Sequence, residues 1–88
     1  EFTYINLGYV YPKPASQSAS INFSVENTSS VSFTVKNLIG QNVKNVNLGN
    51  VAAGTKTITF DVNDLEAGIY FYTLNVNDKS YTKKFIVK

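Results

Sequence analysis

Alternation of apolar and polar residues is the feature that most constrains how this 88-residue chain folds. A period of two residues is that of a half-buried β-strand, whose side chains point in turn to the core and to solvent. No segment shows the 3.6-residue period of an amphipathic helix. The segments predicted to be strands are residues 21–25, 31–35, 43–48, 57–62, 69–76 and 81–88, with residues 2–10 as a further β-prone segment.

Turn-forming residues separate these segments at intervals of roughly 8–12 residues, which is typical of small β-sandwiches. They predict hairpin turns at 27–30 and 77–79 and further turns at 39–42, 49–50 and 53–55. We therefore predict an all-β, immunoglobulin-like antiparallel β-sandwich of about seven short strands, with a small β-barrel as the alternative. The length fits one domain over residues 1–88, with its core in 9–88 and residues 1–8 as a linker or first strand.

The composition argues against most enzyme chemistry. The chain has no Cys and no His, so it lacks thiolate metal ligands, disulfides and the commonest general base. Asp61 and Asp64 faintly resemble a calcium loop, yet the glycine and the distal glutamate of such a loop are missing. We predict no catalytic residues, no metal and no cofactor. Eight Lys without Arg argue against nucleic-acid binding, and no apolar run approaches the roughly 20 residues of a membrane span.

One constellation strengthens the sandwich prediction. The spacing Leu65-x-x-Gly68-x-Tyr70 is that of the tyrosine corner, in which a Tyr at the start of a late strand hydrogen-bonds back to the preceding loop. Gly68 would let the chain turn sharply into that strand. Asp64 is expected to accept backbone N–H groups within the turn. We interpret these residues as structural.

Several stretches, taken together and in this order, resemble a known family. The first is Tyr11-Pro12-Lys13-Pro14, and the last ends in a strand with two adjacent lysines. The stretches are residues 11–14, 20–23, 35–43, 53–55, 64–72 and 81–88. They are similar to the type A C-terminal sorting domain of Bacteroidota proteins secreted by the type IX secretion system, over about residues 9–88. The structural motif of that family falls here on Pro12, Pro14, Leu65, Gly68 and Tyr70.

The resemblance implies a targeting function. It implies that this domain follows an N-terminal cargo domain and directs it through the outer-membrane translocon, with the help of an outer-membrane shuttle protein. It also implies removal by a sortase-like cysteine peptidase, with a cut near or before residue 1. The chain would then pass through the periplasm and reach the cell surface or the medium. Lacking an initiating Met, it is expected to be a piece of a longer protein.

The resemblance further implies that the terminal strands carry the export signal, on Gly68, Tyr70, Tyr72, Lys83, Lys84 and Lys88. Because neighbouring strand residues point to opposite faces, Lys84 and Lys88 are expected to point outward. Lys83 shares the face of Phe85 and Val87, which are expected in the core, and should reach solvent near the start of the strand. The alternative role for these lysines is to keep an edge strand soluble.

Three further hypotheses remain open. A carbohydrate-binding or adhesin-type module could use Tyr4, Tyr9 and Tyr11 as a stacking platform, although tyrosines also cover small cores with their hydroxyls in water. A structural spacer between domains is the other alternative. A loosely attached first strand, residues 2–10, could also exchange between two molecules to form a strand-swapped homodimer.

Overall fold

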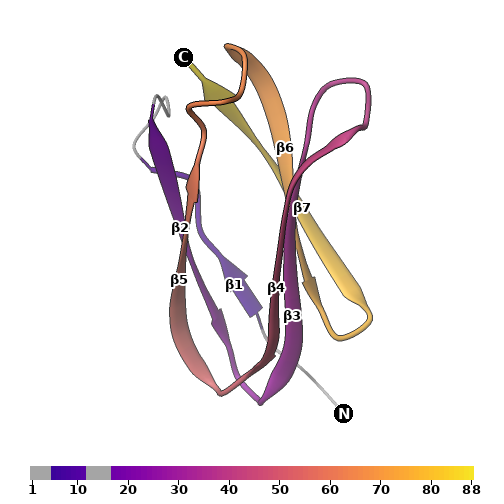
Figure 1. Cartoon of the computed structure of the whole chain (residues 1–88). Helices are drawn as coiled ribbons and strands as arrows, with labels where there is room; N and C mark the ends of the chain where they lie inside the picture. The colour runs from indigo at the N-terminus through magenta and orange to yellow at the C-terminus, as the bar shows by residue number, and fades with distance from the viewer. Residues whose placement is uncertain (1–4, 12–16) are drawn as a thin grey trace.

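The computed structural model describes residues 5–11 and 17–88, which form seven β-strands in two antiparallel sheets (Figure 1). Six strands are eight to ten residues long, and the first has three. The strands are β1 (Ile5–Leu7), β2 (Ser18–Val25), β3 (Ser29–Lys36), β4 (Asn42–Val51), β5 (Gly54–Asp61), β6 (Gly68–Val76) and β7 (Lys79–Val87). No helix occurs in the described ranges.

The sheet order establishes the immunoglobulin-like sandwich. One sheet has the order β1-β2-β5, and the other has the order β4-β3-β6-β7. These correspond to strands A-B-E and to C-F-G of the immunoglobulin fold, except that β4 pairs with β3 in the second sheet. The sheets are hydrogen-bonded separately, so the all-β prediction is confirmed as a sandwich and the barrel alternative is wrong.

The core lies between the two sheets and follows the predicted alternation. Every second residue of β2, β3 and β6 is buried, including Phe23, Phe33 and Tyr72. Aromatic rings join the layers: the Phe33 ring centroid lies 5.1 Å from that of Phe60 on the opposite sheet. Phe85 and Val87 are also buried, as predicted for the last strand.

The turn predicted at 27–30 is not a hairpin. β2 and β3 belong to different sheets, so residues 26–28 carry the chain from one layer to the other. Ser29 and Ser30 already belong to β3, and the buried Ser29 hydroxyl donates a hydrogen bond to the Asn27 carbonyl. The polar composition indicated a break in the strands correctly, but it could not distinguish a hairpin from a crossing.

The turn predicted at 49–50 is a bulge inside β4. The register of β3 with β4 shifts between Val31 and Ser32, which pair with Gly49 and Asn47. Gly49 has a φ of 67°, a left-handed conformation that costs little without a Cβ. Its N–H donates to the Asn47 side chain at 3.0 Å. The glycine therefore twists an edge strand and does not end it.

The turn predicted at 77–79 is a hairpin between β6 and β7. Val76 pairs with Lys79, which leaves a two-residue loop. Asn77 adopts a φ of 55°, a conformation that Asn tolerates better than most residues. The Asn77 side chain also accepts the Ser30 N–H at 3.0 Å. This hairpin places β7 at the edge of the four-stranded sheet.

Candidate functional site

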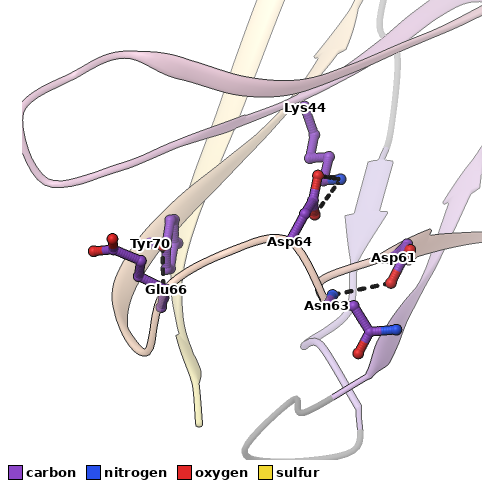
Figure 2. Close-up of polar contacts among 6 residues, drawn as sticks. All are labelled: Lys44, Asp61, Asn63, Asp64, Glu66 and Tyr70. Carbon is purple, nitrogen blue, oxygen red and sulfur yellow. Dashed lines mark hydrogen bonds and ion pairs between the residues drawn. The ribbon is translucent and has the colours of Figure 1, made fainter.

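The β5–β6 connection and the start of β6 form a tyrosine corner (Figure 2). The Tyr70 hydroxyl donates to the Glu66 carbonyl at 2.7 Å, and Tyr70 is 7% exposed. Leu65 packs against the core and donates its N–H to the Val62 carbonyl. Gly68 opens β6 with a φ of 153°, a conformation that L side chains rarely adopt. The corner thus fixes where the chain enters β6.

Tyr70→Phe removes this hydroxyl while keeping the ring. We expect the free energy of unfolding to fall by about 1 kcal/mol, since the change deletes one part-buried hydrogen bond. Urea unfolding would measure it, with Tyr81→Phe at a half-buried position of β7 as the matched control. Equal stabilities for the two variants would mean that the corner contributes nothing beyond its ring.

The Asp61 and Asp64 carboxylates, at the end of β5 and in the connection after it, both accept hydrogen bonds within the protein (Figure 2). The Asp64 carboxylate pairs with the Lys44 ammonium on β4 at 2.8 Å, and this hydrogen bond lowers the pKa of Asp64. The side chain that caps the local turn is Asp61, which accepts the Asn63 N–H at 2.9 Å. The backbone N–H of Asp64 itself also interacts with the Asp64 carboxylate and lowers its pKa further, so the expected local backbone contact of Asp64 is present within its own residue. Among the residues that the structure describes, no three carboxylates gather in a group able to hold a metal ion.

Tyr72 connects the core to residues 8–11, which precede β2, through a hydrogen bond to Gly8. Its side chain is fully buried, and its hydroxyl donates to the Gly8 carbonyl at 2.9 Å. Gly8 in turn donates its N–H to the Asn22 carbonyl of β2 at 2.8 Å. Val10 is buried nearby in sequence, and Tyr11 forms an isolated bridge with Ser20. The predicted exchange of this segment between two molecules is not tested by a single chain and stays a prediction.

Burial raises the pKa of Tyr72 to about 12, from an ordinary value of 10.0. Because the folded-state pKa is the higher one, the contribution of Tyr72 to stability is complete below its unfolded pKa and is lost as the pH rises through the folded value. We therefore expect unfolding free energies, measured in urea at about pH 8 and about pH 11, to fall more for the wild type than for Tyr72→Phe. Equal losses in the two proteins would contradict this assignment.

Lys83 is half-buried and covers an aromatic ring. Its ammonium lies 4.1 Å from the centroid of the Tyr9 ring, within the range of a cation–π contact. Lys83 was expected to reach solvent near the start of β7, and it is partly exposed there with its ammonium over the exposed ring of Tyr9. The Tyr11 hydroxyl instead donates to Asn22 of the three-stranded sheet. The two tyrosines thus engage different sheets, and Tyr4 lies outside the described residues.

The six residues expected to carry the export signal fall into three groups. Tyr70 and Tyr72 are buried, so their side chains offer no surface to a partner. Gly68, Lys84 and Lys88 are exposed, whereas Lys83 is held against Tyr9. Pro12 and Pro14, assigned to the structural motif, lie outside the described residues.

An exposed lysine on β3 shares the outer face of Lys84. Lys36 and Lys84 both pair with Phe71, from opposite sides of β6. Lys36 was not among the residues expected to carry a signal, although the alternation of β3 points it away from the face of its buried neighbour Val35. Recognising Lys36 requires knowing which strands pair, and the two-residue alternation of a single strand does not give its neighbours in the sheet.

Comparison with known proteins agrees with this architecture. The family model described as “Secretion system C-terminal sorting domain” matches residues 9–88. The match contains all of the tyrosine corner and both strands of the β6–β7 hairpin. No curated protein matches the chain. The described residues contain no helix long and apolar enough to span a membrane.

Proposed function

The chain belongs to the secretion system C-terminal sorting domain family, which serves type IX secretion, and we propose that the outer-membrane translocon recognises it as a folded sandwich. The observation that carries this proposal is the family match over residues 9–88, nearly the whole chain. Sorting domains are not an enzyme family. The domain serves as a signal that directs its cargo to the cell surface or the extracellular space.

The residues of β6 and β7 have two different roles in recognition, one structural and one of direct contact. Tyr70 and Tyr72 hold the two strands in position, because both are buried and both hydrogen-bond to backbone carbonyls of other segments. Lys84 and Lys88 are exposed, and they are the side chains that the translocon or its shuttle protein contacts. After transit through the periplasm, a sortase-like cysteine peptidase separates the domain from the cargo on the N-terminal side of β1.

An export assay tests this function. Residues 1–88 are fused behind a periplasm-directed fluorescent protein in a type IX-competent bacterium, and surface and medium fluorescence are compared with those of the reporter alone. Export of the fusion, with retention of the reporter alone, supports the proposal. Retention of the fusion in a host that exports its own cargo would overturn it, and glycan arrays would then test the carbohydrate-binding alternative.

The structure determines which variants are informative in this assay. A deletion of residues 80–88 removes Phe85 and Val87 from the core, so loss of export would not separate recognition from unfolding. Replacing Lys83 disturbs the contact with Tyr9. The pair Lys84→Ala/Lys88→Ala avoids both problems, because both side chains are exposed. We expect this pair to reduce export without changing the melting temperature.

A further inference from the structure

Six residues form a basic-apolar face on the outside of the four-stranded sheet, at the end where β6 begins and β7 finishes. Across the strands, Lys36, Phe71 and Lys84 lie in one row, and Ile69 lies beside Ile86 in the next. With strands about 4.8 Å apart, the two lysines of the row stand about 10 Å apart, on either side of the Phe71 strand. Lys88 follows Ile86 by two residues and is exposed. We call the set Lys36, Ile69, Phe71, Lys84, Ile86 and Lys88 the basic-apolar face.

The apolar members of this face are unusually accessible. Ile86 is 52% exposed and Ile69 is 37% exposed, while Phe71 is half-buried between the lysines. Two further exposed apolar residues, Leu38 and Ile39, lie in the β3–β4 turn at the same end of the sheet (Figure 1). Single exposed apolar residues are common, but a group at one place, rimmed by polar groups, marks an interaction site.

The charge of the surrounding sheet has a single sign. The four strands of this sheet contain five Lys and no Asp or Glu, and all four lie within the described residues. Among the described residues, the one ion pair joins Lys44 to Asp64, and it does not involve Lys36, Lys84 or Lys88. The side-chain carboxylate nearest to the face along the chain is that of Glu66, in the connection before β6. Within residues 5–11 and 17–88, therefore, no ion pair occupies the cations of the face.

We infer that the basic-apolar face docks onto an acidic protein surface that presents an apolar contact between carboxylates. Charge complementarity supports this partner, because opposite charges at the rim steer association and fix its orientation. The apolar centre fits the usual anatomy of an interface, in which a buried apolar patch is surrounded by polar groups. This inference rests on the proposed function, since the partner would be a component of the secretion machinery.

A different role for these lysines is protection of the β7 edge against pairing with other chains. A charge of either sign gives that protection, because both are strongly hydrated. Lys84→Glu therefore keeps a charged edge and reverses its sign. The two roles make opposite predictions for this variant: edge protection predicts normal export, and docking on an acidic surface predicts its loss.

The experiment uses the fluorescent fusion described above and four single variants. Lys84→Glu and Ile86→Ser alter the face. Lys56→Glu, on β5 of the other sheet, changes the net charge by the same amount, and Leu48→Ser removes another exposed apolar side chain, on β4. We expect each face variant to lower export roughly tenfold, as for loss of a central interface contact, and each control to export like the wild type. Melting temperatures of the purified domains confirm folding.

The outcomes separate the two proposals. Failure of the wild-type fusion to be exported overturns the proposed function itself. Normal export of Lys84→Glu and Ile86→Ser, with an exported wild type, overturns the docking inference and the contact proposed for Lys84, while the sorting function itself stands. Loss of export for Lys84→Glu but not for Ile86→Ser would indicate that the partner is a polyanion, such as a phosphorylated lipid. That result would also overturn the inference that the partner is an acidic protein surface. Equal losses for Lys56→Glu and Lys84→Glu would mean that net charge matters and the face does not.

Discussion

Phe33→Ala is expected to lower the free energy of unfolding by about 3–5 kcal/mol, the range for removing a buried aromatic ring. Phe33 is 1% exposed at the centre of β3. Its ring centroid lies 5.1 Å from that of Phe60 in the opposite sheet and 6.0 Å from that of Tyr72 on β6. Alanine would leave a cavity between the two layers, and a domain of this size has only about 5–15 kcal/mol of stability in total.

Urea unfolding followed by tyrosine fluorescence or circular dichroism would measure this loss. Ile86→Ala is the matched control, since it removes an apolar side chain that is 52% exposed, and it should change the stability by less than about 1 kcal/mol. A Phe33→Ala variant as stable as Ile86→Ala would contradict the central position of Phe33 in the core. In the export assay, the same pair separates the effect of unfolding from the effect of altering the surface.

Gly8→Ala is expected to cost about 1–3 kcal/mol, as overpacking of a closely packed site does. A Cβ at this position would lie 2.9 Å from the Asn22 carbonyl oxygen, closer than side-chain carbons come in folded proteins. This oxygen belongs to the backbone of β2, so it cannot move aside by rotation as the end of a flexible side chain could. The substitution would also disturb the two hydrogen bonds of Gly8, one from Tyr72 and one to Asn22.

The Gly8 prediction has a local readout in addition to stability. Loosening of this segment should expose amides around Val10 to faster hydrogen exchange, while amides in the β6–β7 hairpin stay protected. Ser18→Ala, at an exposed position in the same sheet, is the control and should change the stability by less than about 0.5 kcal/mol. Unchanged exchange at Val10 in Gly8→Ala would contradict a close approach of the segment to β2.

Parts of the candidate site were predictable because they depend on neighbours in sequence. Leu65, Gly68 and Tyr70 lie within one turn and the start of one strand, so their spacing alone predicts a tyrosine corner. The outward direction of Lys84 follows from the alternation in β7. The contact of Lys83 with Tyr9 could not be predicted in this way, because the two residues come from opposite ends of the chain. The same holds for the pairing of Asp64 with Lys44.

The sequence by itself determined the approximate course of most strands and the side chains that β2, β3 and β6 bury. A period of two residues assigns each residue to one of two faces, and burial of the apolar face follows from its removal from water. It does not say which strands become neighbours, since any strand with one apolar face satisfies the same pattern. The tertiary structure alone decided that β4 joins β3, that Gly49 bends a strand, and that residues 26–28 cross between sheets.

The basic-apolar face shows the same division most clearly. Alternation places Lys36, Ile69 and Lys84 on the outside of three separate strands. Only the register of β3, β6 and β7 puts them side by side, because backbone hydrogen bonds between strands fix the neighbours across a sheet. Short-range patterning therefore determines the fold class and the corner, and long-range pairing determines the surface that a partner meets.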